Sequence, residues 1–297
     1  MMKLMYTMTT ALSPVFDSVL HVQNILFLKR DNFTDNDEIK YAIMRYGAVV
    51  TGMHYHDEYY YNGTYYYDGD DASDHAVTIV GWDDNYSKDN FKNTPQENGA
   101  WIVRNSWGPD WDDDGYFYVS YYDTQLALNV GDDYSYTFVL NDTLKFNRNY
   151  QYDIGAMAWN FYLDNSRIFY KNVFTATDSE VLGGVSTYFK ELTNWTVSIY
   201  VNDVLRTMKN GISPAGYWTI LLDDAIHLEC GDVFDVVFNC SCDVEKIYLP
   251  TVSAGNVNQM NLMENVSLFS GDGREWKDLY EYSSIACIKA FTITDDI

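Results

Sequence analysis

The sequence is short of basic residues and has no long apolar run. Among its 297 residues, 19 are Lys or Arg and 43 are Asp or Glu, so the formal net charge at pH 7 is −24. Nucleic acids and anionic membranes attract cations, so this deficit excludes both as expected partners. No stretch of about 20 apolar residues exists, so we expect no membrane span. Residues 1–18 lack a continuous apolar segment, which argues against a secretory signal in this chain.

Cysteine is scarce and unevenly placed. The chain contains Cys230, Cys240, Cys242 and Cys287, and residues 1–74 contain none. Cys240 and Cys242 fall on one face of an expected strand, so they cannot easily bridge each other. Either could pair with Cys230 or Cys287 in an exported protein, and buried free thiols are the alternative that the sequence leaves open.

Tyrosine, by contrast, is abundant. There are 27 Tyr within an aromatic share of 17%, and the hydrophobic share of 47% is enough for real cores. Tyrosine favours half-buried pleated surfaces, and Asn, Asp and Gly favour the turns between strands, so this composition predicts a strand-rich protein. The length predicts two domains.

One segment predicts a helix, between Phe33 and Gly47. Asp35 and Glu38 have the spacing of a capping box, and Gly47 stands where a left-handed C-terminal cap is expected. The side chains that repeat on one helical face are Ile39, Ala42, Ile43 and Tyr46.

Strand-like runs follow the helix. They cover 48–53, 75–82, 100–105 and 116–122. Asn62-Gly63 lies between two tyrosine runs in a strong hairpin signal, which we expect to face solvent; the alternative is that its tyrosines border a cleft. From about residue 147 the pattern becomes a series of short strands, typical of an all-β sandwich or barrel. We therefore divide the chain into an unassigned segment (1–19), a first domain (20–123), a linker (124–146) and a second domain (147–297).

The most specific motif lies in the first domain. The sequence DHAVTIVGW is followed by WIVRNSWGPDW and by a Gly-Tyr strand. Together they resemble the C-terminal half of papain-like cysteine peptidases, from about residue 20 to residue 123. The matching residues are Asp74, His75, Ala76, Val77, Gly81, Trp82, Trp101, Asn105, Ser106, Trp107, Gly108, Trp111, Gly115 and Tyr116.

This resemblance implies a hydrolase that cleaves protein or peptide substrates. His75 would be the catalytic base and acid, Asn105 would orient its ring, Trp107 would shield their hydrogen bond, and Asp74 would support the histidine. A thiolate needs a neighbouring imidazolium, and the imidazole needs an acceptor that fixes its tautomer, so these residue types suit the chemistry. We expect a ring nitrogen of His75 within hydrogen-bonding reach of the Asn105 side-chain oxygen, at one rim of two neighbouring strands.

The nucleophile does not follow the family's order of Cys, His and Asn. All four cysteines lie after His75, and neither Ser13 nor Ser18 has the expected neighbours. We expect an incomplete or split peptidase, without the N-terminal helical lobe that carries the cysteine and the oxyanion-hole donors. A Cys-bearing fragment is then an expected partner, and the chain alone is expected to be inactive.

Two further features complete the first domain. Gly52 aligns, within about one residue, with a position lining the family's second substrate pocket, and a glycine easing a strand bend is the alternative. The acidic clusters Asp68–Asp74 and Asp112–Asp114 lack the EF-hand pattern, so we assign solvated turns and no metal; the resemblance implies no cofactor.

The second domain resembles the lectin-like β-sandwich of some microbial surface peptidases. The similar segments are YQYDIG, GGVSTYF, GYWTIL, GDVF and SGDGREW, between residues 147 and 293. The resemblance implies an extracellular or cell-surface location and binding of glycan or cell wall, although Trp276 fits a core position better than a sugar platform. The fold class expected is α+β: a β-barrel-like papain-type lobe plus a lectin-like sandwich. The alternative function is a non-catalytic adhesion or glycan-binding protein that keeps a peptidase remnant.

Overall fold

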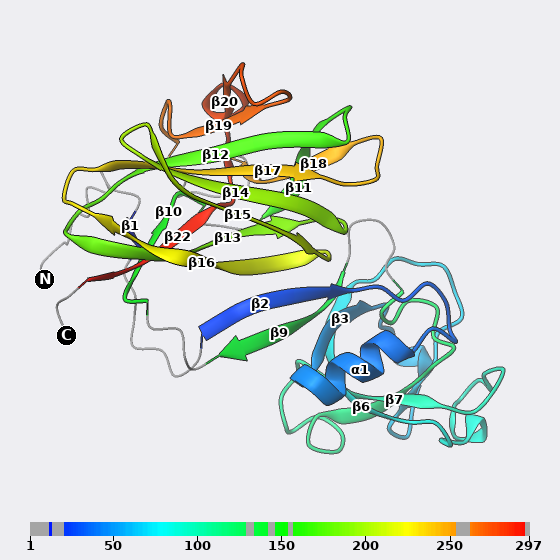
Figure 1. Cartoon of the computed structure of the whole chain (residues 1–297). Helices are drawn as coiled ribbons and strands as arrows, with labels where there is room; N and C mark the ends of the chain where they lie inside the picture. Colours follow the sequence, from blue (N-terminus) through cyan, green and yellow to red (C-terminus); the bar gives the residue numbers. More distant parts are fainter. Residues whose placement is uncertain are drawn as a thin grey trace, which may run out of the picture. The chain divides into compact units, whose positions relative to one another are not determined.

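The computed structural model describes residues 12–13, 21–128, 134–141, 146–153, 157–253 and 262–294. These residues form two compact units (Figure 1). The first, called the lobe below, comprises the described residues between 25 and 140. The second, called the sandwich, comprises those from 141 on, together with residues 12–13 and 21–24. Strand β2 (His21–Leu28) crosses the division.

The lobe is one sheet with one α-helix. After β2, whose residues 25–28 belong to the lobe, the strands in spatial order are β9 (Ser135–Asn141), β3 (Val49–Met53), β6 (His75–Asp83), β7 (Ala100–Arg104), β8 (Tyr116–Ser120), β5 (Thr64–Tyr65) and β4 (Tyr60–Tyr61). All of these pairings are antiparallel except that of β5 with β8. Two short 3-10 turns, Asp57–Tyr59 and Lys88–Asn90, lie in the connections.

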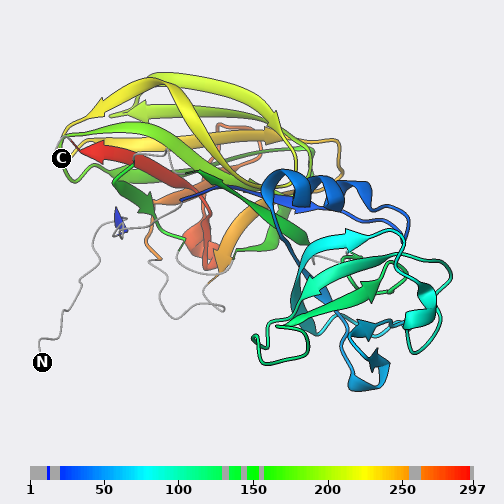
Figure 2. The same cartoon turned by 90° about the horizontal axis from the view of Figure 1, so that it is seen from below.

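Helix α1 (Asp37–Tyr46) packs against β3 and β6, and Figure 2 shows it lying along one side of these strands. Ile39 and Ala42 are buried and Ile43 packs on the same core, as the periodicity predicts, whereas Tyr46 stays exposed. Apolar spacing therefore identified the helix and most of its buried face.

Both predicted caps of α1 are wrong in detail. The N-cap is Asn36, which makes no side-chain capping bond, and Glu38 instead accepts a hydrogen bond from the Lys29 backbone N–H (3.2 Å). Gly47 has a positive φ of 107° but a ψ of −151°, so it is not in the left-handed helical region. A contact with the chain before the helix has replaced the local capping box.

The hairpin at Asn62-Gly63 forms, but its surroundings differ from the prediction. Both turn residues have positive φ, as a two-residue hairpin of this type requires. Thr64 and Tyr65 are buried because β5 adds to β8, so this hairpin is not simply solvent-facing. The aromatic pattern of the hairpin does not show which distant strand will pair with it and bury its residues.

The sandwich contains three groups of paired strands. The first is β1 (Leu12–Ser13), β10 (Arg148–Gln151), β22 (Lys289–Thr294), β13 (Glu180–Phe189) and β16 (Gly216–Leu228). The second is β11 (Ala158–Leu163), β18 (Ile247–Ser253) and β21 (Ser284–Ala286). The third is β15 (Val204–Ser213), β14 (Thr193–Val201), β17 (Val233–Ser241), β12 (Arg167–Thr175), β19 (Ser267–Ser270) and β20 (Lys277–Asp278).

Alternate side chains of these strands make the sandwich core. Val197, Ile199, Phe234 and Phe238 are fully buried, and their sequence neighbours face outward. The predicted α+β class, with a β-rich lobe and a β-sandwich, is confirmed. Strand β15 was not predicted, because its exposed sequence VLRTMKNGIS lacks a continuous apolar alternation.

Strand β9 lies within the segment that the sequence analysis assigns to a linker. It contacts the lobe through the pairing of Val50 with Tyr136, and Thr137 donates to the Ala48 carbonyl oxygen (3.0 Å). The lobe thus extends to residue 140. The remaining boundaries stay proposals.

Candidate active site

His75 and Asn105 come from neighbouring strands. His75 is the first residue of β6, and Asn105 directly follows the last residue of β7. The two strands are antiparallel, with Thr78 opposite Arg104, so the start of β6 and the end of β7 lie at the same rim. His75 Nε2 lies 2.7 Å from Asn105 Oδ1. The expected proximity of the two side chains is confirmed.

The orientation of the Asn105 amide determines the histidine tautomer. Its Oδ1 also accepts a hydrogen bond from the Ser106 backbone N–H at 2.8 Å, and a backbone N–H can only donate. Oδ1 is therefore an acceptor toward both neighbours, so the proton lies on Nε2 of neutral His75. Nδ1 keeps its lone pair and is the atom able to take a proton from a nucleophile.

Asn105 is itself held firmly. Its side chain is largely enclosed, with 6% of the residue exposed, and its backbone N–H donates to the Gly115 carbonyl oxygen at 2.8 Å. Its Nδ2 is buried and has no hydrogen-bond partner among the described residues. The turn that follows β7 thus holds the side-chain oxygen of Asn105 in place, and that oxygen orients the His75 ring.

An aromatic wall borders the pair. The Trp107 ring centroid lies 4.8 Å from that of His75, and Tyr55 meets Trp107 edge-on at 4.7 Å. Trp111 meets the other side of this group, 5.3 Å from Trp107, and packs on Phe117. Trp107 nevertheless remains 46% exposed, so the wall has an open face.

Asp74 acts on the backbone before β6 and not on the His75 ring. Its Oδ1 accepts from the Tyr55 N–H at 2.9 Å, and its own N–H donates to the Met53 carbonyl oxygen at 3.1 Å. Its other oxygen lies 3.6 Å from His54 Nδ1. These contacts join the end of β3 to the start of β6, where His75 stands.

Gly52 lies in β3 opposite Ala76. A Cβ atom at this position would come 2.3 Å from Ser73 Oγ, so the space beside the glycine is taken by Ser73, whose hydroxyl donates to the Met53 carbonyl oxygen. Sequence reasoning missed both Ser73 and Tyr55. Neither belongs to the motif, and only the pairing of β3 with β6 brings them to this rim.

Comparison with known protein families divides the chain close to the division between the lobe and the sandwich. Residues 17–138 match the family described as papain family cysteine protease, and residues 149–292 match the lectin like domain. A segment similar to the papain family thus precedes a segment similar to the lectin like domain. The papain-type lobe carries His75 and Asn105.

Among solved structures, the protease and lectin-like domains of Cwp84 are similar over both units. Cwp84 is a surface layer associated protein of Clostridium difficile, 26% identical, with a TM-score of 0.75 over 94% of this chain and 64% of that chain. The Cwp84 cysteine protease after propeptide cleavage gives the same identity and TM-score over 93% and 71% of the two chains.

Curated relatives match part of the chain. Serine-repeat antigen protein 5 of Plasmodium falciparum is 33% identical over 155 residues, which cover 48% of this chain and 15% of that protein. A cysteine protease of Blomia tropicalis is 35% identical over 101 residues, 32% of this chain and 27% of that protein. The chain therefore spans well under a third of either relative.

None of the four cysteines is placed as an activated thiol in the papain-type lobe. All belong to the lectin-like sandwich and all are free. Burial raises the pKa of Cys240 to about 12 and raises the pKa values of Cys242 and Cys287. Cys230 is exposed and its thiol donates to the Thr177 carbonyl oxygen. A reactive nucleophile needs the opposite shift, toward thiolate.

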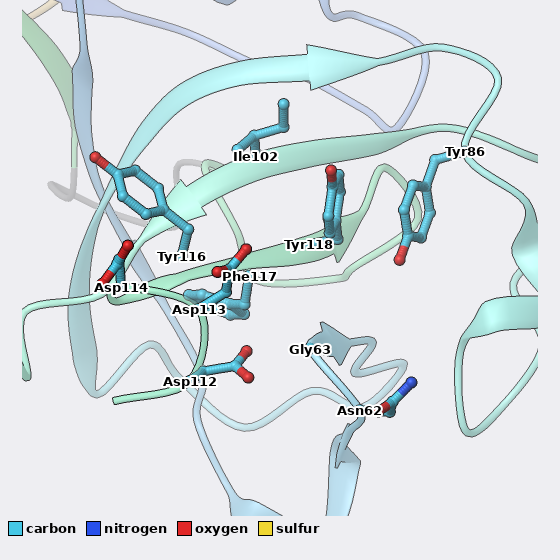
Figure 3. Close-up of a pocket in the computed structure, with 10 residues that line it drawn as sticks. All are labelled: Asn62, Gly63, Tyr86, Ile102, Asp112, Asp113, Asp114, Tyr116, Phe117 and Tyr118. Carbon is cyan, nitrogen blue, oxygen red and sulfur yellow. The ribbon is translucent and has the colours of Figure 1, made fainter. Parts of the chain in front are cut away.

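The acidic turn of the papain-type lobe borders an open hollow of about 500 Å³. Figure 3 shows Asp114 next to Tyr116 on one side of the close-up and Tyr86 next to Tyr118 on the other. The rings of Tyr86 and Tyr118 stack at 4.1 Å. Among the described residues there is no group of three His, Cys, Asp or Glu side chains arranged to hold a metal ion. Within that part of the chain, no helix has the length and apolar composition of a membrane span.

Proposed function

We propose that the papain-type lobe supplies the histidine and asparagine of a cysteine peptidase whose thiol lies on a Cys-bearing segment outside residues 25–140. The observation that carries this proposal is the 2.7 Å contact of His75 Nε2 with Asn105 Oδ1, which leaves Nδ1 as the base. The substrates are proteins or peptides. The enzyme is an incomplete or split form, in which this chain alone is inactive.

The reaction follows from the roles of these groups. His75 Nδ1 takes the thiol proton, and the resulting imidazolium stabilises the thiolate. The thiolate attacks the carbonyl carbon of the peptide bond, His75 returns the proton to the leaving amine, and water then hydrolyses the thioester. Asn105 keeps the ring in plane through both proton transfers, and Trp107 limits access of water to their hydrogen bond. Asp74 supports the pair through the backbone of the β3–β6 connection. We assign Gly52, opposite Ala76, to the second substrate pocket on the resemblance alone.

The decisive experiment supplies the thiol in trans. The 297-residue chain is incubated with a thiol-directed epoxide probe, alone and co-folded with a Cys-bearing helical lobe of a papain-type peptidase. We expect no His75-dependent labelling of the chain alone, and peptide hydrolysis by the complex that disappears in His75→Ala. The matched control is His56→Ala, which removes an exposed histidine at the start of the turn that follows β3.

Two outcomes would overturn the proposal. The first is labelling of one of the chain's own cysteines that is lost in His75→Ala. The second is an inactive complex in which circular dichroism and size-exclusion chromatography show both parts folded and associated.

A second activity is favoured by the lectin-like match and by a hollow on the sandwich. We infer that the sandwich binds glycan or cell-wall carbohydrate, with or without proteolysis. A cell-surface or extracellular location follows from the same reasoning, since Cwp84 is surface layer associated. Retention of the chain on a glycan array, and its release by free sugar, tests this activity separately from hydrolysis.

A further inference from the structure

The sandwich has an open hollow of about 390 Å³ on the outer face of the sheet formed by β15, β14, β17, β12 and β19. This volume lies within the range of roughly 300 to 1,000 Å³ that small-ligand sites occupy. Its floor consists of the side chains that alternate with the core residues of β14, β17 and β12, above all Ser198, Asp235 and Lys171. These outward side chains would ordinarily be solvated, yet those of Lys171 and Asp235 are only 21% and 18% exposed.

The connection between β19 and β20 forms one wall of the hollow. It contributes Gly273 and Trp276, and it is held in one conformation by its own hydrogen bonds. Asp272 Oδ1 accepts from the N–H groups of Glu275 (3.0 Å) and Arg274 (2.8 Å), and these bonds lower the pKa of Asp272 to about 2. The hollow is therefore preorganised, which reduces the entropy lost when a ligand binds.

A hydrogen-bond donor and a hydrogen-bond acceptor lie near an aromatic ring in this hollow. Lys171 Nζ donates to Asp235 Oδ2 at 2.5 Å and lies 5.1 Å from the Trp276 ring centroid. The hydroxyls of Thr196 and Ser198 make no hydrogen bond with another described side chain, so both remain available to a ligand. A lysine paired with an aspartate offers a donor and an acceptor side by side, the arrangement that two adjacent hydroxyl groups require.

Charge and sheet pairing restrict the type of ligand. Lys171 is neutralised by Asp235 and the chain carries a net charge of −24, so an anion is disfavoured. Strands β14, β17 and β12 are each paired on both sides, so no free backbone edge is available in the floor to a peptide strand. With anions and peptide strands disfavoured, a neutral molecule with many hydroxyl groups and one apolar face fits the hollow best.

We propose that this hollow binds a neutral pyranose of a glycan, with its apolar face toward Trp276 and its hydroxyls toward Asp235, Ser198 and Thr196. This site rests on the glycan-binding part of the proposed function and is independent of the peptidase part.

The test begins with the 297-residue chain on an array of defined neutral mono- to hexasaccharides. The best ligand is then titrated by isothermal calorimetry against Trp276→Ala, which removes the apolar platform, and Ser198→Leu, which fills the floor. We expect each variant to bind at least tenfold more weakly. Matched controls are Tyr162→Ala and Ser179→Leu, which change an exposed tyrosine and an exposed serine of the sandwich outside the hollow and should bind as the parent does.

Thr196→Val changes one hydroxyl to a methyl group with little change of volume. It therefore tests the site even if the larger substitutions unfold the sandwich, and we expect at least threefold weaker binding. Unchanged affinity in folded Trp276→Ala and Ser198→Leu would overturn the site and leave glycan binding intact. Failure to retain any saccharide, or retention of peptides in its place, would overturn both the site and the glycan-binding function.

Discussion

At the scale of single residues, the amide of Asn105 is the group on which the histidine depends. It accepts from His75 Nε2 and from the Ser106 N–H, and it is enclosed by the turn that ends at Gly115. A buried acceptor that serves two donors stabilises both the ring orientation and the turn.

We therefore expect Asn105→Ala to free the His75 ring and to lower the free energy of unfolding by about 1 to 3 kcal/mol. The measurement is the imidazole N–H proton in a low-temperature NMR spectrum, which should be visible downfield in the parent and lost to solvent exchange in the variant. His56→Ala serves as the control and should keep this resonance. Persistence of the resonance in Asn105→Ala would show that another group holds the proton.

Asp123 is the most deeply buried carboxylate among the described residues of the lobe. It accepts from the backbone N–H groups of Tyr67, Gln125 and Leu126, and it lies near Arg30. Burial raises its pKa to about 6, although the three hydrogen bonds and the charge of Arg30 each act to lower it. Because the pKa is higher in the folded state than the value of 3.8 for a free side chain, the folded state binds the proton more tightly.

The stabilisation from this proton is complete below about pH 4 and is lost as the pH rises through 6. The shift of about two pH units corresponds to roughly 3 kcal/mol. We expect the difference in unfolding free energy between the parent and Asp123→Asn to fall by about that amount between pH 4 and pH 7. Urea denaturation at several pH values measures it, and a difference independent of pH would contradict the assignment.

At the scale of the elements, Gly99, directly before β7, lies close to the ring of Tyr121, directly after β8. This contact allows the packing of the two segments to be tested. A Cβ atom at Gly99, which has φ of +114°, would come 2.4 Å from Tyr121 Cδ2. Gly47 has a similar φ of +107°, but a Cβ there would meet nothing within 4 Å. The backbone strain of an alanine is therefore comparable at the two sites, and only Gly99 adds a clash.

We expect Gly99→Ala to destabilise the chain by about 1 to 3 kcal/mol more than Gly47→Ala, the usual range for overpacking. Chemical denaturation of both variants measures the difference. Equal losses of stability would mean that Tyr121 can move away freely, and that the contact does not fix the start of β7.

At the scale of the whole molecule, the four thiols report on the oxidation state of the chain. Cys230 is exposed, Cys242 is half-buried, and Cys240 and Cys287 are buried, all as free thiols. We expect a disulfide exchange reagent to modify Cys230 quickly in the native protein and all four thiols after denaturation. A reducing agent should leave the melting temperature unchanged, and fewer than four reactive thiols in denaturant would indicate a disulfide.

Much of the architecture could be predicted from local pattern. The helix between Phe33 and Gly47, four of the lobe strands (β3, β6, β7 and β8) and most sandwich strands follow from apolar periodicity and turn residues, which act over a few positions. The caps of α1 and the covering of β5 could not be predicted. In both cases a contact with a distant segment replaced the local arrangement, at Lys29 for Glu38 and at β8 for Tyr65.

The sequence by itself determined that His75 and Asn105 belong together, because the motif that carries them is specific in both residue type and order. It also shows that residues 1–74 contain no cysteine. Only the tertiary structure decided which nitrogen of His75 faces Asn105, because the Ser106 N–H orients the amide oxygen. It alone decided that Trp276 borders a hollow, because the wall and the floor come from strands far apart in the chain, and spacing along a sequence carries no information about such distances.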